Sequence, residues 1–273
     1  MRATLLLANH CFKARFKANR MKVLWPILVL FILGSAWGLS DVNANILGDI
    51  EVDSAYTVLY ISSAFILLSA TLGAVFISFD GISRDRISGV LEIKLSQPIS
   101  RKSLGSSLIL GHWAAIALPT CLLSLIAIVI IGERMDEYPS IGEIGLYIGA
   151  TMLVLLWYTL IQLIASSWAD DMGSSIALGM GSWMLFTLLW LLLTTVVAGL
   201  LGVAVDQNEN AEWLQIQALM DLLSPNGLYH LLLEIPLSEF NRGINTSLVI
   251  LSAIVWTFLP TWLLMKRLQY LTP

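Results

Sequence analysis

Charged side chains are scarce in this sequence. Asp, Glu, Lys and Arg make up 12% of the 273 residues, whereas hydrophobic residues make up 57% and the mean hydropathy is +0.80. Such a chain carries too much apolar surface for a soluble domain, so the composition excludes that class and predicts an all-α integral membrane protein. The net charge of -4 gives no reason to expect nucleic acid as a partner.

Six stretches contain no Asp, Glu, Lys or Arg at all. They are residues 23–40, 56–79, 105–131, 144–169, 172–205 and 244–265. Each reaches the roughly 17–20 residues that cross about 30 Å of hydrocarbon as a helix, which satisfies every backbone polar group internally. The sequence therefore predicts six transmembrane helices in one domain. The fifth stretch is too long for one upright helix, so we expect it to tilt, to project beyond the bilayer or to break near Gly199 and Gly202.

The six spans also lack the groups that drive transport or chemistry inside a membrane, apart from His112. Ion-coupled transporters and intramembrane enzymes keep ionisable groups where the ion or the reaction needs them. The bare spans argue against both classes. We interpret His112, near the cytosolic end of the third span, as a hydrogen-bonded residue rather than a proton relay, and we expect the energy for any transport to come from another chain.

Cofactor chemistry is missing as well. Cys11 and Cys121 lie in different contexts, so neither a disulfide framework nor a metal site can be built from them. The sequence has no Walker A run, no His-Glu-x-x-His motif and no paired carboxylates within a span. The methionines show no clustered ligand spacing, and most tryptophans lie where an interfacial belt would place them. We therefore expect no metal, no cofactor and no catalytic residue in this chain.

The charges that are present alternate from loop to loop. Thirteen of the fifteen Lys and Arg residues lie in 1–22, 80–104 and 266–267, and fourteen of the nineteen acids lie in 41–55, 132–143 and 206–243. Positively charged loops stay in the cytosol. This pattern predicts a multi-pass protein of the cell membrane with both termini in the cytoplasm.

The basic N-terminal segment 1–22 precedes the first span. It has an apolar helical face and bases directed away from it, which predicts an amphipathic interfacial helix on anionic head groups. The face comprises Leu5, Ala8, Phe12 and Phe16, and the bases are Lys13, Arg15 and Lys17. The alternative is a solvated basic tail that only sets topology. We interpret the first span as uncleaved rather than as a signal peptide, because its basic lead is long and no small-x-small cleavage site follows.

Two further segments lie outside the spans. Asp170 and Asp171 precede the fifth span, and we interpret one of them as its N-terminal cap, with a functional role as the alternative. The outer segment 206–243 has an amphipathic pattern over 211–223, a turn signal and a second apolar stretch over 228–237. It predicts an extracytoplasmic re-entrant helix pair before span six.

The charged loop 80–104, between spans two and three, carries three acids and five bases. Ile87, Val90, Leu91 and Leu95 follow a helical spacing that ends at Pro98. The pattern predicts a short amphipathic helix in the cytosol, which could seat in a cleft of a soluble partner and pass its motion to the spans. The alternative is an ordinary charged loop that serves topology alone.

The motif in this loop resembles the signature of ABC-2 type transporter permeases. It reads Ser83-Arg84-Asp85-Arg86-Ile87-Ser88-Gly89-Val90-Leu91-Glu92, followed by Leu95-Ser96-Gln97-Pro98-Ile99-Ser100-Arg101. The order of segments across the chain is similar too, above all to the permease of nitrous oxide reductase maturation systems and its relatives. The resemblance implies a coupling helix that contacts a separate ATP-hydrolysing subunit, with ATP and Mg bound in that subunit. The coupling candidates that it implies are Arg84, Asp85, Arg86, Gly89, Glu92, Pro98 and Arg101.

The loop departs from the family pattern at three positions. Asp85 replaces a commoner glutamate, Val90 stands where threonine is frequent, and Lys94 interrupts a position that is usually apolar. A cation at Lys94 must either extend to water or find an acid on the partner.

Small residues recur at four-residue spacing in the fifth span, at Gly173, Ala177 and Gly181. Such a stripe lets helix backbones approach closely in lipid. It fits a homodimer contact, as the family implies, and equally well a contact within one chain.

Two functions follow from this resemblance. The first is the permease subunit of an exporter, which homodimerises and is driven by a partner ATPase. The second is a mechanotransmission subunit that passes ATP-driven motion to an extracytoplasmic protein through 206–243 without moving a solute. Nothing in the spans selects a cargo, so lipid, drug, ion and peptide all stay open.

Overall fold

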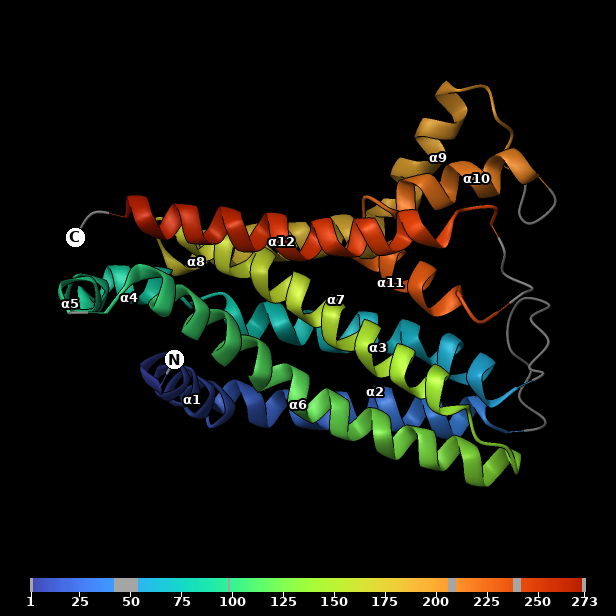
Figure 1. The fold of residues 1–273 in the computed structure, drawn as a ribbon, viewed down its shortest axis with the longest axis horizontal. Helices are drawn as coiled ribbons and strands as arrows, with labels where there is room; N and C mark the ends of the chain where they lie inside the picture. The colour runs from blue at the N-terminus through green and yellow to red at the C-terminus, as the bar shows by residue number, and fades with distance from the viewer. Residues whose placement is uncertain (1, 42–53, 98, 206–209, 238–241, 272–273) are drawn as a thin grey trace.

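The computed structural model describes residues 2–41, 54–97, 99–205, 210–237 and 242–271, which contain helices and no strand. Six apolar helical stretches in these residues are long enough to cross a membrane, as the sequence predicts. They run side by side along the long axis of the molecule (Figure 1). Their helices are α2 (Asn19–Leu39), α3 (Ala55–Ser78), α6 (Arg101–Met135), α7 (Ile141–Trp168), the continuous α8 (Met172–Met184), η1 (Leu185–Leu189) and α9 (Trp190–Leu200), and α12 (Thr246–Tyr270).

Polar caps fix where the long helices begin. The side chain of Ser140 accepts from the backbone N–H of Glu143, whose carboxylate accepts from the N–H of Ser140, which forms a capping box before α7. Ser54 caps α3 and Ser100 caps α6 in the simpler one-bond form. These oxygens satisfy N–H groups that would otherwise lack partners at the helix start.

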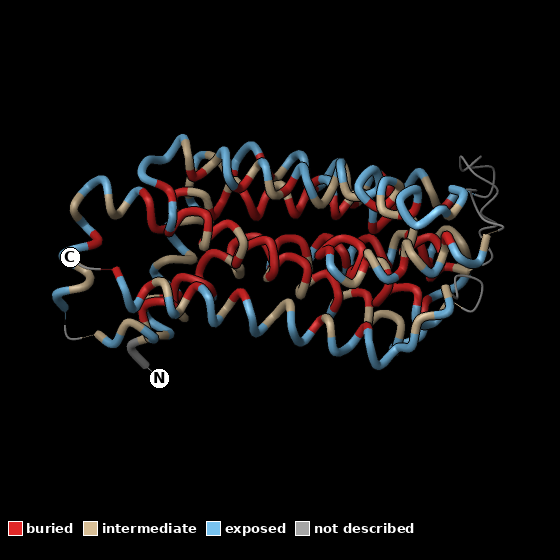
Figure 2. The backbone as a smooth tube through the Cα atoms, turned by 90° about the horizontal axis from the view of Figure 1, so that it is seen from above, coloured by how far each residue is buried: buried red, intermediate tan, exposed pale blue. Residues whose placement is uncertain are grey.

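The core of the bundle lies along α3 and α7. Most of their side chains are buried, while α2, α8 to α9 and α12 expose most of theirs on the outside of the bundle. Figure 2 shows this arrangement as a central band of buried backbone flanked by exposed segments. The outer helices are as apolar as the inner ones, and their exposed side chains face outward, where a membrane would supply lipid.

The remaining helices gather at the two ends of the bundle. The helices α1 (Arg2–Phe16), α4 (Ser83–Ile87) and α5 (Val90–Ser96) lie at the end that also holds both termini (Figure 1). The helices α10 (Ala211–Asp221) and α11 (Pro225–Glu234) lie at the opposite end. Pro225 occupies the first position of α11, behind the cap of Ser224, so the predicted turn signal is the start of that helix.

The charged loop differs from its prediction in one respect. It holds two short helices rather than one, because the backbone of Gly89 turns into the left-handed region at φ 70° between Ile87 and Val90. A residue with a Cβ would be strained there, so this glycine separates the two helices. The apolar spacing that ran from Ile87 to Leu95 therefore spans a turn.

The fifth span changes direction inside the bundle. Residues Leu185–Leu189 form a π-helical turn, and beyond it α9 turns away from the direction of α12 (Figure 1). A π turn inserts an extra residue into the helical repeat, which is an established cause of a bend. We expected a break near Gly199 and Gly202, but the π turn lies earlier in the span. At these two glycines the helix ends, with Gly202 at φ 74°.

Candidate functional site

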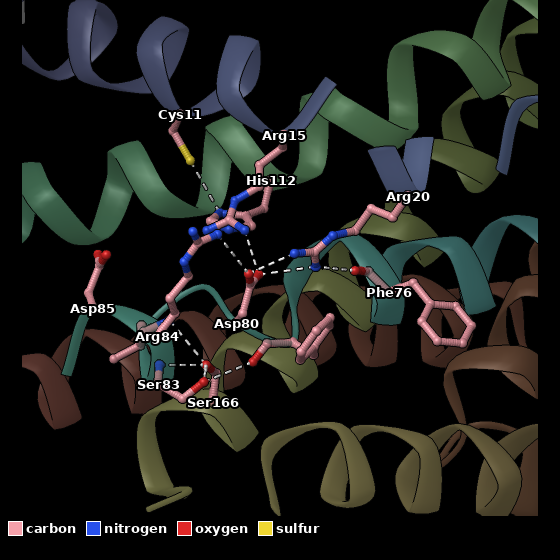
Figure 3. A network of polar contacts seen from close by, with 12 residues as sticks. Cys11, Arg15, Arg20, Phe76, Asp80, Ser83, Arg84, Asp85, His112 and Ser166 are labelled. Atoms are coloured by element: carbon pink, nitrogen blue, oxygen red, sulfur yellow. Dashed lines mark hydrogen bonds and ion pairs between the residues drawn. The ribbon is translucent and has the colours of Figure 1, made fainter. Parts of the chain in front are cut away.

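The charged loop begins at a buried ion cluster around Asp80, which is 2% exposed. Arg15 of α1 and Arg20 of α2 both donate to its carboxylate, and Arg20 also donates to the carbonyl oxygen of Phe76 at 2.7 Å (Figure 3). The turn between α1 and α2 is therefore attached to the end of α3. Arg15 points inward to Asp80, which corrects the expectation that it faces lipid head groups.

The first short helix is fixed to the end of α7. Arg86 donates to the carbonyl oxygens of Ser167, at 2.7 Å, and Ala169, at 2.9 Å. The hydroxyl of Ser166 accepts from the backbone N–H groups of Ile82 and Ser83, both at 3.0 Å. The guanidinium satisfies carbonyls that the helix itself leaves without partners. As a result α4 moves with α7.

Arg101 performs the same function at another helix end. It donates to the carbonyl oxygen of Leu268 at 3.0 Å and also to that of Leu271, so it joins the start of α6 to the end of α12. Arg86 and Arg101 are both among the predicted coupling residues. The structure shows that each donates to backbone carbonyl oxygens of the same chain, which joins α4 to the end of α7 and the start of α6 to the end of α12.

The second short helix leaves one side exposed. Leu91 is buried and Leu95 packs beside it, whereas Ile87, Val90 and Ile93 are 54%, 37% and 61% exposed. Lys94 pairs with Asp85 of the same chain, so it needs no acid on a partner. The exposed apolar side chains of α4 and α5 form a patch on the outside of the molecule, which we name the loop patch and define as Ile87, Val90 and Ile93.

The other predicted coupling residues differ in their surroundings. Arg84 and Glu92 are exposed beside the loop patch, and Asp85 is held by Lys94. Gly89 shapes the turn between α4 and α5. Pro98 lies outside the described residues.

The predicted small-residue stripe of α8 faces outward. Gly173, Ala177 and Gly181 are exposed, and no atom of the described chain lies within 4 Å of a Cβ placed at Gly181. The side of α8 that packs within the chain carries Gly179 instead, whose added Cβ would overlap the side chain of Gln162. Among the described residues, the stripe therefore lies on the outward side of α8, where it is accessible to another helix.

Two smaller predictions are confirmed. Asp171 caps α8 by accepting from the N–H of Ser174 at 2.6 Å. These N–H groups stabilise the carboxylate and lower the pKa of Asp171.

His112 is fully buried and hydrogen-bonded, with its Nδ1 atom 2.8 Å from the carbonyl oxygen of Leu108 and 3.4 Å from Sγ of Cys11. Burial raises the pKa of the Cys11 thiol, which keeps it protonated at neutral pH.

A second ion cluster at the opposite end was not predicted. Arg242 donates to Asp221 at 2.7 Å and to both carboxylate oxygens of Glu234, and the hydroxyl of Tyr60 donates to Glu234 at 2.9 Å. The cluster joins α10, α11 and α3 to the chain before α12. Within the described residues, no group of three His, Cys, Asp or Glu side chains is placed to hold a metal ion.

Comparison with known proteins identifies the family. The family described as ABC-2 family transporter protein matches this chain over residues 16–269. The chain belongs to the ABC-2 transporter family. The match includes all six membrane-spanning stretches and the charged loop between the second and third spans of this ABC-2 permease.

A curated relative agrees with this assignment. The probable ABC transporter permease protein NosY of Pseudomonas aeruginosa is 24% identical over 253 residues, which are 89% of this chain and 88% of that protein. The predicted resemblance is thereby confirmed, and the ABC-2 permease described here is a membrane-spanning transport subunit.

Proposed function

We propose that this ABC-2 permease is the membrane subunit of an exporter, that it pairs with a second copy of itself, and that a separate subunit binds ATP and Mg and drives it from the cytosol. The observation that carries the proposal is the loop patch. Three exposed apolar side chains, with Arg84 and Glu92 beside them, lie on helices that are otherwise anchored firmly to the bundle. A soluble subunit that binds there would bury the patch.

The polar contacts that attach the charged loop to the bundle would transmit movement from a bound subunit to the helices. Asp80 links the start of the loop to α1 and α2, Arg86 links α4 to α7, and Arg101 links the end of the loop region to α12. Four helices outside the loop thus meet it through these polar contacts. A displacement of α4 and α5 by a partner would move these helices together, because packed elements shift as units.

The orientation belongs to the same proposal. The end that holds α1, α4, α5 and both termini carries most of the Lys and Arg residues. We place this end on the cytoplasmic side of the cell membrane. We place α1 at the lipid surface and α10 and α11 as a re-entrant pair at the outer surface. Leu5 and Leu6 of α1 are exposed, and α11 is buried against the bundle, as these placements require.

The proposed pairing of two permeases uses the outward stripe of α8. Gly173, Ala177 and Gly181 would let a second copy approach closely. The alternative, transmission of motion to an extracytoplasmic protein through 206–243, has no contact in the described residues that favours it over export.

The test is expression of the tagged permease together with its genomic neighbourhood, co-purification of any nucleotide-binding subunit, and measurement of ATP hydrolysis. We expect Glu92→Arg to release the subunit or to uncouple its hydrolysis, because the reversed charge lies at the loop patch. Glu137→Arg is the matched control, since it reverses an exposed acid in the loop before α7, at the opposite end. Equal retention and equal hydrolysis in both variants would show that the loop patch is not the docking surface.

A further inference from the structure

A cavity of about 600 Å³ lies between α1, the α4–α5 segment and the start of α6. Four of its lining residues are cations, which come from three different parts of the chain: Arg15, Arg20, Arg84 and Lys94. The cavity lies at the same end of the molecule as both termini (Figure 1). The cavity and the loop patch adjoin each other: Val90 belongs to both and Arg84 lines the cavity, whereas Ile87 and Ile93 do not line it.

The charges around the cavity do not balance. Two carboxylates face the four cations: Asp80, which accepts from Arg15 and Arg20, and Asp85, which accepts from Lys94. Arg84 lies 3.7 Å from Asp80, and its side chain is 65% exposed. A surplus of two positive charges is left, and Arg84 has most of its five N–H donors available. The cavity therefore presents donors to an anion.

His10, Ser88, Gln97 and Ser107 also line the cavity, but most of the other lining residues are apolar. They include Leu7 and Ala14 of α1, Val90 of α5, and Leu104 and Leu108 of α6. An inorganic anion would leave these side chains in contact with water, whereas an amphiphile would cover them with its chain. Leu5 and Leu6, which are 59% and 69% exposed on the neighbouring surface of α1, extend the apolar surface outward from the cavity.

The cavity combines a surplus of cations, mostly apolar other lining residues and a position at one end of the spanning helices. These three features together match an anionic amphiphile. We propose that the cavity binds the phosphate headgroup of an anionic phospholipid from the cytosolic leaflet, with Arg84 as its principal donor and the first part of an acyl chain against Leu7 and Leu108. A phosphodiester presents several oxygen acceptors, and arginine binds such groups through two parallel N–H bonds.

The lipid would join two parts of the chain that otherwise have few direct contacts. On one side it contacts α1, and on the other it contacts α4 and α5. Its presence would therefore stiffen the loop that carries the loop patch. The binding itself needs neither a partner ATPase nor a second permease, so it is tested on the full-length chain alone in neutral detergent, where the outcome is independent of the proposed coupling.

The experiment titrates the purified chain with dioleoyl phosphatidylglycerol and measures the thermal unfolding midpoint. Dioleoyl phosphatidylcholine and inorganic phosphate are titrated in parallel. We expect the anionic lipid to raise the midpoint by about 5 °C at a concentration about 100-fold above its dissociation constant. We expect much smaller shifts with the zwitterionic lipid and with phosphate.

Two variants locate the effect. Arg84→Gln removes the most accessible donor, and Ala14→Trp fills the cavity from an exposed position of α1 without changing the charge. Arg84→Gln should weaken binding of the anionic lipid by about tenfold, the value of one lost charge-assisted hydrogen bond. Ala14→Trp should weaken it as well, because the indole ring would occupy the space that the lipid needs. Lys17→Gln is the matched control, because it removes an exposed cation from the segment joining α1 to α2 without touching the cavity, and it should bind as the original chain does.

Several outcomes would overturn the proposal. One is an equal shift with the zwitterionic lipid, which would show that the headgroup charge is not recognised. Another is an equal shift with inorganic phosphate, which would assign the cavity to a soluble anion. A third is unchanged lipid affinity in both Arg84→Gln and Ala14→Trp, measured on variants whose lipid-free midpoints match that of the original chain.

Discussion

Arg20 and Asp80 contact each other through both ends of their planar groups. Nη2 of Arg20 lies 2.7 Å from Oδ2 of Asp80, and Nη1 lies 3.2 Å from Oδ1. A paired fork of this kind is among the stronger hydrogen-bonded contacts in proteins. It holds the start of α2 to the first residues after α3, with Arg15 as a second donor. The charged loop therefore starts from a fixed point rather than from a free helix end.

This contact leads to a first prediction. Asp80→Asn leaves Arg15 and Arg20 without their buried carboxylate, and we expect it to cost about 3 kcal/mol of unfolding free energy. Equilibrium unfolding in mixed micelles measures the loss. Asp170→Asn is the control, because that carboxylate is exposed, and it should stay within about 0.5 kcal/mol of the original chain. If both variants unfold alike, the cluster around Asp80 does not stabilise the fold.

A second prediction separates holding from docking. Arg86→Gln removes the donors to Ser167 and Ala169, so we expect a loss of about 2 kcal/mol in stability, as for hydrogen bonds to charged groups. Glu92→Gln changes an exposed side chain and should leave the stability within about 0.5 kcal/mol. Retention of the ATP-hydrolysing subunit is then compared at matched amounts of folded permease. Glu92→Gln should retain less of the subunit, whereas Arg86→Gln should retain as much as the original chain does. Weak retention with Arg86→Gln but not Glu92→Gln would contradict the assignment.

The sequence predicted the six spans closely because the signal for a membrane helix is local. A run without charge, such as 144–169, must form a helix in lipid whatever its neighbours are, and α7 covers Ile141–Trp168. The cap at Asp171 was also predictable, since it depends on residues within one turn. The charged motif marked the position of the loop but not its exposed side, because Leu91 and Leu95 pack inward and Ile93, which the predicted spacing did not include, is exposed.

The sequence could not show which charges meet. Arg15 and Asp80 are 65 positions apart, and Arg101 reaches Leu268 across 167 positions. Helical periodicity places Arg15 on a polar face but does not say whether that face meets lipid head groups or another helix. One signal was available, because Asp80 is an acid directly behind a long apolar run on the side of the membrane rich in bases. The π turn at Leu185–Leu189 depends on packing against α11 and has no comparable signal.

A third prediction uses the two faces of α8. Gly179 packs against Gln162, so Gly179→Leu should separate α7 from α8 and lower the thermal unfolding midpoint of the single chain. Gly181 faces open space on the outward stripe, so Gly181→Leu should leave that midpoint unchanged. Instead it should reduce the fraction of permease that cross-links as a pair in the membrane. A pair that survives Gly181→Leu at its original yield would exclude the stripe as the contact.

A fourth prediction concerns the outer ion cluster. Arg242→Gln leaves Asp221 and Glu234 facing each other in a mostly buried site, where both carboxylates have lost their cation. We expect a loss of about 3 kcal/mol in unfolding free energy. Replacing Glu212, an exposed acid of α10, by Gln is the control and should have little effect. Equal stability of the two variants would mean that the cluster does not hold α10 and α11 to the bundle.

The last prediction is a pH dependence at the start of α8. The N–H groups of this first turn lower the pKa of Asp171 from its ordinary value of 3.8, so the charged form binds them more tightly than the protonated form does. The cap therefore stabilises the helix start fully above pH 3.8 and is lost as the pH falls through the lower folded value. Hydrogen exchange of a peptide covering 171–180, corrected for intrinsic rates, should show less protection at pH 3 than at pH 6. Asp171→Asn keeps an oxygen that accepts from Ser174 but cannot titrate, so its protection should not change with pH. The same pH response in both proteins would place its origin elsewhere in the chain.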